Sequence, residues 1–114
     1  MTLNRKCKAL KIYISEDSEY KGHSLYHAIT HKFAELGMAG ATVTRGLEGF
    51  GHEKRMRSTS IIDISLNLPI IIEIIDTAEK IEQVIPLVNE MVEDGLITVT
   101  DVNVIKYGKE STKE

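Results

Sequence analysis

The spacing of hydrophobic residues changes along the chain, and each change marks a new predicted element. Apolar and polar residues alternate over residues 10–14, which predicts a first strand. From residue 25 to residue 36 the apolar positions recur at steps of three and four, the spacing of one helical face, and Gly37 ends this predicted helix. Residues 40–45 contain β-branched side chains and predict a second strand.

A polar loop and two extended segments follow. The loop is expected at residues 52–59, after a glycine-rich stretch, and the extended segments at residues 61–66 and 69–75. Pro69 suits the start of a strand, because it cannot donate a ladder hydrogen bond inside a central strand. We expect the loop to be mobile in the free protein, since it has little apolar surface to bury.

A second helix and a last strand complete the predicted elements. The helix covers residues 77–92, with Thr77 as its N-cap. Pro86 removes one helical hydrogen bond, which predicts a kink. The last strand covers residues 96–106, and the phase of its apolar positions changes near Asp101, which predicts a β-bulge there.

The order β-α-β-β-α-β predicts an α+β domain with a ferredoxin-like fold and an antiparallel sheet. We expect one domain over residues 1–114, with a core at residues 8–108 and a short charged C-terminal tail. Both helices should cover one face of the sheet, and an uncovered apolar face usually marks an interface between subunits. The residues predicted to face the helices are Leu10, Ile12, Ile14, Ile70, Ile72 and Ile74, and those predicted on the open face are Tyr13, Ile71 and Ile75.

The composition narrows the class of protein. With 42% hydrophobic and 27% charged residues, the chain matches an ordinary globular protein. The net charge of −3 argues against a generic nucleic-acid binder, which needs a basic surface. Cys7 is the single cysteine, which excludes an intrachain disulfide and fits a reducing compartment. No signal peptide or long apolar run is recognisable, so a cytoplasmic location is expected.

Positive charge is concentrated in one region of the sequence. This region contains Arg45, Lys54, Arg55 and Arg57, together with His52. Guanidinium groups suit phosphates and carboxylates, so these residues are candidates for contact with a phosphate or an acidic partner. The alternative is a solvated loop.

Three histidines, His23, His27 and His31, recur at four-residue steps along the predicted first helix. On one helical face, an i,i+4 pair of histidines can chelate a transition metal. No carboxylate or cysteine completes a recognisable motif, so the alternative is a solvated face. We therefore assign no metal site and keep the three histidines as candidates.

No pattern typical of catalysis is present. Ser15, Glu16 and Asp17 share one predicted loop, but a nucleophile needs a base and an orienting third group. Glu73 interrupts an apolar strand, where a structural partner at a subunit interface would explain it. We expect a protein that acts by binding, without catalytic residues and without a required cofactor.

Several segments resemble PII signal proteins. One is residues 37–44, Gly-Met-Ala-Gly-Ala-Thr-Val-Thr, followed by Gly49-Phe-Gly51, and another is residues 67–76, Asn-Leu-Pro-Ile-Ile-Ile-Glu-Ile-Ile-Asp. The segments at residues 12–17, 25–29 and 45–51 resemble more closely a PII-like branch catalogued mainly as a domain of unknown function. The resemblance extends over residues 8–108.

PII proteins are homotrimers that bind adenine nucleotides between subunits and control partner proteins through a flexible loop. The resemblance implies the same here, with a partner such as a membrane transporter or an enzyme. Glycines near a phosphate let the main chain come close to the anion. The residues that the resemblance assigns to the nucleotide are Thr42 on the adenine side, Gly49, Phe50, Gly51 and His52 near the phosphates, and Lys106 as a C-terminal basic residue.

Two departures from the PII pattern change the expected ligand. The loop after the second helix is reduced to Glu93-Asp-Gly95, without the phosphate-binding lysine, and only Lys106 occupies a C-terminal basic position. AMP or ADP, which need fewer cations, are therefore expected rather than ATP. The alternative is a trimeric divalent-metal-binding protein that uses the first-helix histidines, since a related ferredoxin-like family is linked to divalent-cation tolerance.

Overall fold

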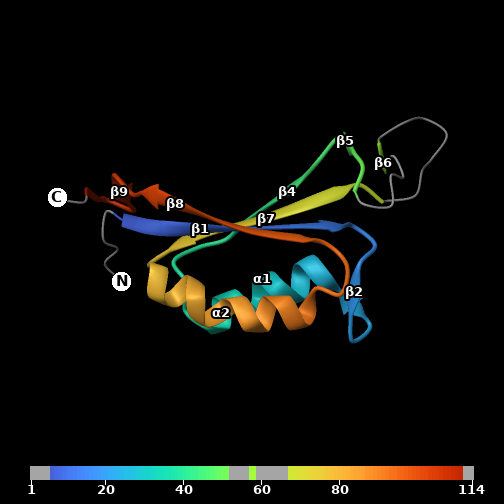
Figure 1. The fold of residues 1–114 in the computed structure, drawn as a ribbon, viewed down its shortest axis with the longest axis horizontal. Coiled ribbons are helices and arrows are strands. Elements are labelled where there is room, and N and C mark those ends of the chain that lie inside the picture. Colours follow the sequence, from blue (N-terminus) through green and yellow to red (C-terminus); the bar gives the residue numbers. More distant parts are fainter. Residues whose placement is uncertain (1–5, 52–56, 59–66, 112–114) are drawn as a thin grey trace.

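A four-stranded antiparallel sheet, covered on one face by two helices, forms the body of the protein in a computed structural model (Figure 1). The structure describes residues 6–51, 57–58 and 67–111. The strand order β4-β7-β1-β8 is that of a ferredoxin-like fold, which confirms the predicted α+β class. The sheet strands are β1 (Lys6–Ser15), β4 (Thr42–Arg45), β7 (Pro69–Asp76) and β8 (Leu96–Asn103), and the helices are α1 (Leu25–Glu35) and α2 (Ala78–Met91).

Among the described residues, three short strand pairs extend from this body. They pair β2 (Glu19–Tyr20) with β3 (His23–Ser24), β5 (Glu48–Gly49) with β6 (Arg57–Ser58), and β9 (Lys106–Tyr107) with β10 (Glu110–Ser111). One prediction was wrong here, because the last long strand ends at Asn103. Within the segment predicted as a charged tail, Glu110–Ser111 form a hairpin strand. Gly108 reverses the chain between β9 and β10 with a φ of 63°, which glycine adopts without strain.

The core lies between the sheet and the helices, as the alternation of side chains predicts. The six residues expected to face the helices, from Leu10 to Ile74, are all buried, and they pack with Ile29 and Phe33 of α1 and Ile81 and Val88 of α2. Ile75 on the open face is 36% exposed. Tyr13 and Ile71 face each other across β1 and β7 on the same open side and are partly exposed. Among the described residues, the helices therefore cover only one face of the sheet.

The predicted β-bulge near Asp101 is absent. β8 pairs with β1 in one continuous register from Lys6 opposite Asn103 to Tyr13 opposite Leu96. The apolar residues change faces because the helix side of the sheet becomes polar at this end, where Lys8 Nζ bonds Asp101 Oδ1 at 2.9 Å. This contact raises the pKa of Lys8 and lowers that of Asp101.

Both helices are delimited by local hydrogen bonds. At the end of α1, Gly37 N–H donates to Ala34 O and Met38 N–H donates to Phe33 O, and Gly37 has a φ of 70°. At the start of α2, the Thr77 hydroxyl accepts from Lys80 N–H, which confirms the predicted N-cap. α2 continues through the exposed Pro86. No helix among the described residues is long and apolar enough to cross a membrane.

Gly95 allows β8 to begin against β1. A Cβ atom on Gly95 would lie 2.6 Å from the backbone oxygen of Tyr13 and 3.0 Å from the Val92 side chain. We predict that Gly95→Ala lowers the free energy of unfolding by about 1–3 kcal/mol, because the added methyl group forces the backbone apart. Urea denaturation at fixed protein concentration measures this change. Gly40→Ala is the matched control, since a Cβ there meets no atom within 4 Å, and an equal loss in both variants would contradict the prediction.

Candidate functional site

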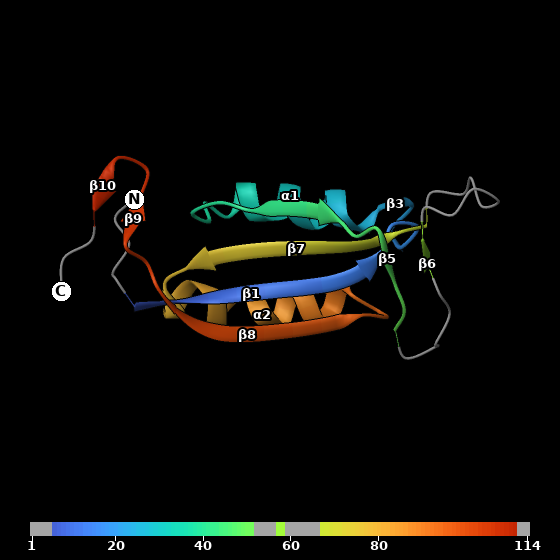
Figure 2. The ribbon, with the colours of Figure 1, turned by 90° about the horizontal axis from the view of Figure 1, so that it is seen from above.

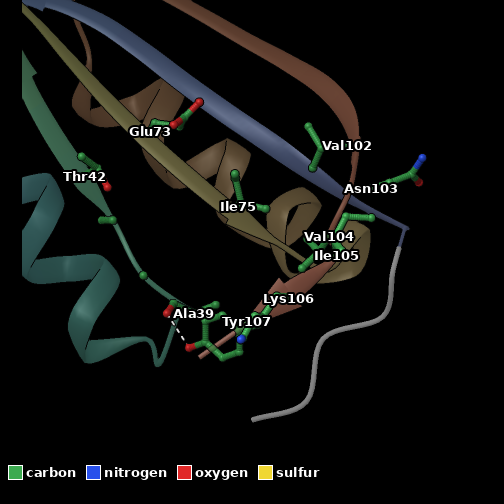
Figure 3. Close-up of a pocket in the computed structure, with 12 residues that line it drawn as sticks. Ala39, Thr42, Glu73, Ile75, Val102, Asn103, Val104, Ile105, Lys106 and Tyr107 are labelled. Carbon is green, nitrogen blue, oxygen red and sulfur yellow. Dashed lines mark hydrogen bonds between the residues drawn. The ribbon is translucent and has the colours of Figure 1, made fainter. Parts of the chain in front are cut away.

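A surface pocket of about 700 Å³ lies at the β9 end of the open sheet face (Figure 3). Its first wall is the connection from α1 to β4, and its second is the segment that leaves β8. Between them, the floor comes from residues whose register places them on the open face: Thr42, Glu73, Ile75 and Val102. The pocket therefore occupies the face that the helices leave uncovered.

Both backbone groups of Ala39 are fixed, which makes the first wall rigid. Its N–H donates to the Asp76 carboxylate at 2.8 Å, and its carbonyl oxygen accepts from the Tyr107 hydroxyl at 2.6 Å (Figure 3). Asp76 is fully buried and also accepts from Thr77 N–H at 2.7 Å. A buried carboxylate that accepts charge-assisted bonds from two backbone amides is a strong anchor. The wall is thus preorganised before any ligand arrives.

The pocket combines apolar surface with a few charged and polar groups. Ile75, Val102 and Ile105 supply the apolar part. Thr42 sits directly opposite Glu73 in the β4–β7 register, and the Glu73 carboxylate lies 3.6 Å from Lys11 Nζ. Lys106 adds a cation on the second wall. Such a lining can hold a flat, mostly apolar group by its faces and orient it by polar groups at its edge.

The pocket lining does not include three of the predicted nucleotide residues, Gly49, Phe50 and Gly51. They belong to the β5 segment at the end of the molecule opposite to β9 (Figure 2). A Cβ on Gly49 would approach the Pro69 ring at 3.3 Å, whereas a Cβ on Gly51 would meet no atom within 4 Å. Phe50 is 65% exposed, and its neighbour Leu47 is 76% exposed. This end presents open backbone beside exposed apolar side chains.

A buried carboxylate joins the two strands that lead into and out of the 46–68 segment. Glu16 is 9% exposed and forms a salt bridge with Arg45 at the end of β4. Its other oxygen accepts from Leu68 N–H at 3.4 Å, and Glu16 N–H donates to Leu68 O at 2.9 Å. Arg45 remains half exposed, so the guanidinium is oriented by Glu16 and still accessible. The sequence offered only one signal for Glu16, a carboxylate directly after a buried strand.

The structure brings together only part of the predicted nucleotide site. Thr42 and Lys106 line the same pocket, whereas residues 49–51 lie at the other end of the sheet. Three further predicted residues, His52, Lys54 and Arg55, are outside the described residues. Arg57 is described by its backbone alone, which pairs with Gly49. Ala39, Asp76 and Tyr107 were missed by the sequence reasoning.

The predicted row of three histidines is corrected by the structure. His23 lies in β3, before α1 begins at Leu25, so it does not share the helix with the other two. His27 and His31 do lie together on α1, with ring centroids 4.2 Å apart. Within the described residues, no group of three or more potential ligands could hold a metal ion.

Cys7 is poorly suited to act as a nucleophile. Burial raises the pKa of its thiol, and the nearby Asp76 carboxylate raises it further. The thiolate is the reactive form, so a raised pKa lowers its fraction at neutral pH.

The DUF190 family model, described as "Uncharacterized ACR, COG1993", matches residues 7–104. The chain belongs to the DUF190 family. A UPF0166 protein of Aquifex aeolicus (strain VF5) is 37% identical over 100 residues, which cover 88% of this chain and 94% of the relative. UPF0166 protein MJ1524 of Methanocaldococcus jannaschii is 38% identical over 102 residues, which cover 89% of this chain and 94% of the relative.

Membership of DUF190 confirms the resemblance to a PII-like branch of unknown function. The matched region of this DUF190 protein contains Glu16, Thr42 and Asp76, and it ends before Lys106 and Tyr107. The floor and first wall of the pocket therefore belong to the family region. The C-terminal hairpin that closes the second wall lies just beyond it.

The Glu16–Arg45 contact should contribute measurably to stability. We predict a coupling energy of about 1 kcal/mol between Glu16→Gln and Arg45→Met in a double-mutant cycle. The reason is that the Glu16 carboxylate is buried, so water cannot replace the Arg45 guanidinium as its partner. Chemical denaturation of the wild type, both single variants and the double variant measures it. A parallel cycle on the exposed Lys32–Glu35 pair should give a markedly smaller coupling. Additive effects at Glu16 and Arg45 would refute a cooperative clamp.

Proposed function

We propose that this DUF190 protein is a PII-like signalling protein that binds AMP or ADP at the boundary between subunits of a homotrimer. It acts by binding rather than catalysis, in the cytoplasm, and it regulates a partner protein through the segment predicted as a loop at residues 52–59, of which residues 57–58 form β6. The observation that carries this proposal is the preorganised pocket on the open sheet face, which contains Thr42 and Lys106.

The pocket suits the base and ribose of a nucleotide. Adenine presents flat apolar faces and a polar edge, which match the apolar residues around Ile75 and the Thr42 hydroxyl beside them. The bonds from Ala39 to Asp76 and Tyr107 fix the backbone at the start of this wall, next to Gly40 and Ala41. Fixed groups lose little conformational entropy on binding, which favours affinity.

The phosphates would extend from the pocket toward the β5 end. Thr42 pairs with Glu73, and a Cβ at Gly49 would contact Pro69, so four residues of β7, or about 13 Å, separate the two positions. Lys106 lies on the opposite side of Thr42, so one chain does not place Lys106 at the phosphate end. In a closed ring of copies, each chain can supply the groups that its neighbour lacks. A subunit boundary therefore fits better than a site within one chain.

The connection between α2 and β8 supports a preference for few phosphates. It passes from Val92 to Gly95 through Glu93 and Asp94, so acidic side chains stand where a phosphate-binding loop would need cations. Each added phosphate brings negative charge that only Lys106 and the basic residues near 45–57 could offset. The affinity for the nucleotide should therefore rise little with phosphates beyond the first or second.

A partner protein would meet the β5 end. Leu47 and Phe50 expose apolar surface there, beside the half-exposed Arg45. Exposed apolar side chains next to a basic group suit a partner with an acidic rim, such as a membrane transporter or an enzyme. A nucleotide at Gly49 and Gly51 would lie next to this surface and could change its shape.

Calorimetry with AMP, ADP and ATP tests nucleotide binding. We expect affinities that differ by less than about tenfold across the three nucleotides, because the cations of a full triphosphate site are missing. Gly51→Val should weaken binding by more than about tenfold by blocking backbone approach, while it leaves the fold intact. Lys106→Ala should also weaken binding, and His27→Ala serves as the unaffected control. No heat with any nucleotide near millimolar concentration would refute this function.

Light scattering tests the trimer. We expect three times the chain mass of 12.8 kDa, because association buries the open sheet face. Ile71→Lys places a charge on that face and should shift the protein toward the monomer, whereas Glu90→Lys on the exposed side of α2 should not. A wild type that stays monomeric at micromolar concentration would contradict the trimer, and an unaffected Ile71→Lys trimer would contradict the assigned face.

A further inference from the structure

We propose that His27 and His31 form a two-imidazole chelate for a late divalent transition metal, Ni²⁺ or Cu²⁺, on the exposed side of α1. This site is separate from the nucleotide pocket and does not depend on the proposed function. It uses His27 and His31, which lie side by side on α1, and it does not include His23, which lies in β3. Imidazole nitrogen is a common ligand for both metals.

The helix sets the spacing of the two rings. Residues four apart are neighbours on one helical face, with Cβ atoms about 5–6 Å apart. His27 and His31 place their ring centroids 4.2 Å apart, with the ring planes tilted by 42°. Both side chains are exposed, so a hydrated ion can reach them and the rings can rotate about their side-chain bonds. The two rings are therefore near enough for one ion to bind both after rotation of the side chains.

A metal that accepts its ligands at right angles needs the smaller movement of the two rings. With a metal–nitrogen bond of about 2.0–2.1 Å, each ring centroid lies about 3.2 Å from the metal. Two imidazoles at 90° then have centroids about 4.5 Å apart, and at the tetrahedral angle about 5.2 Å. The observed 4.2 Å is nearer the first value. Adjacent positions at 90° are typical of Cu²⁺ and Ni²⁺, whereas structural Zn²⁺ is tetrahedral.

The surroundings leave the remaining coordination positions open. Glu35 follows His31 by four residues, but its carboxylate pairs with Lys32 Nζ at 3.8 Å. The Tyr26 ring stands edge-on to His27 with the centroids 6.4 Å apart. No third ligand joins the pair within the part of the chain that the structure describes. A bound ion would keep several waters, so binding should be reversible rather than structural.

The site would remain accessible in the proposed trimer. α1 lies in the helix layer, on the side of the sheet opposite to the open face (Figure 1). A trimer that buries the open face would leave this layer outside. Metal binding and nucleotide binding can therefore be measured separately on the same protein.

A swap variant isolates the spacing of the two rings. His31→Lys combined with Lys32→His keeps composition and charge but moves the second imidazole about 100° around the helix. The exposed Lys32–Glu35 pair that it disrupts is worth little to stability. His23→Ala removes the third histidine of the sequence pattern and is the matched control. His27→Gln serves as a second test variant should the swap fail to fold.

Calorimetry with Ni²⁺, on full-length protein without a polyhistidine tag, tests the proposal. We expect one Ni²⁺ per chain and a rise in melting temperature for the wild type and for His23→Ala. The swap and His27→Gln should lower the Ni²⁺ affinity by at least about tenfold, because only one imidazole of the pair can then reach the ion. Electron paramagnetic resonance with Cu²⁺ should detect two coordinating nitrogens in the wild type and one in His27→Gln.

Three outcomes would overturn the site. They are no Ni²⁺ binding to the wild type near millimolar concentration, equal affinity of the wild type and the swap, or loss of binding in His23→Ala. Nucleotide affinity is measured on the same proteins and should be equal in the wild type and the swap. A failure of the nucleotide function would therefore appear in both proteins, whereas a failure of the metal site would appear only in the Ni²⁺ titrations.

Discussion

Within the part of the chain that the structure describes, the β1–β7 pair buries only one of its faces beneath the helices, and the rest of the structure follows from this constraint. On one side, alternate isoleucines such as Ile12 and Ile72 pack beneath both helices and are fully buried. Apolar burial of this kind is the main favourable contribution to folding. On the other side, Lys11, Glu73 and Thr42 share the surface with Ile71 and Ile75. A face that mixes charge with apolar surface can hold both a subunit contact and a ligand.

Much of the fold could be predicted because its signals are local. The Gly37 cap and the Thr77 cap depend on residues within one turn, and the strand faces depend on a period of two. The β-bulge near Asp101 was predicted wrongly because the cause of the phase change is not local. Lys8, which is 93 residues away in the sequence, forms the polar contact that replaces the core at that end of the sheet. Spacing alone could not distinguish these two explanations.

The candidate site could be predicted only where a resemblance pointed to it. Thr42 and Lys106 came from the PII pattern and share one pocket. The groups that shape the pocket left no such pattern, because Ala39 is held by Asp76 and Tyr107, which are 37 and 68 residues further along the chain. Glu16 was assigned to an unremarkable loop for the same reason. Its partners, Arg45 and Leu68, become neighbours only when β4 and β7 pair.

The position of Asp76 also explains why the two proposed sites should act independently. α1 carries the histidine pair and leads directly into the pocket wall, so a metal that stiffened the helix could in principle reach Ala39. Ala39, however, is tied to the buried end of β7 through Asp76, and Gly37 ends the helix before the wall begins. Two binding sites are coupled when an element between them has two conformations and each ligand shifts the equilibrium between these conformations. The pocket wall is held in one conformation by the sheet core, so a change in α1 should not move it. Nucleotide and metal should therefore bind without cooperativity.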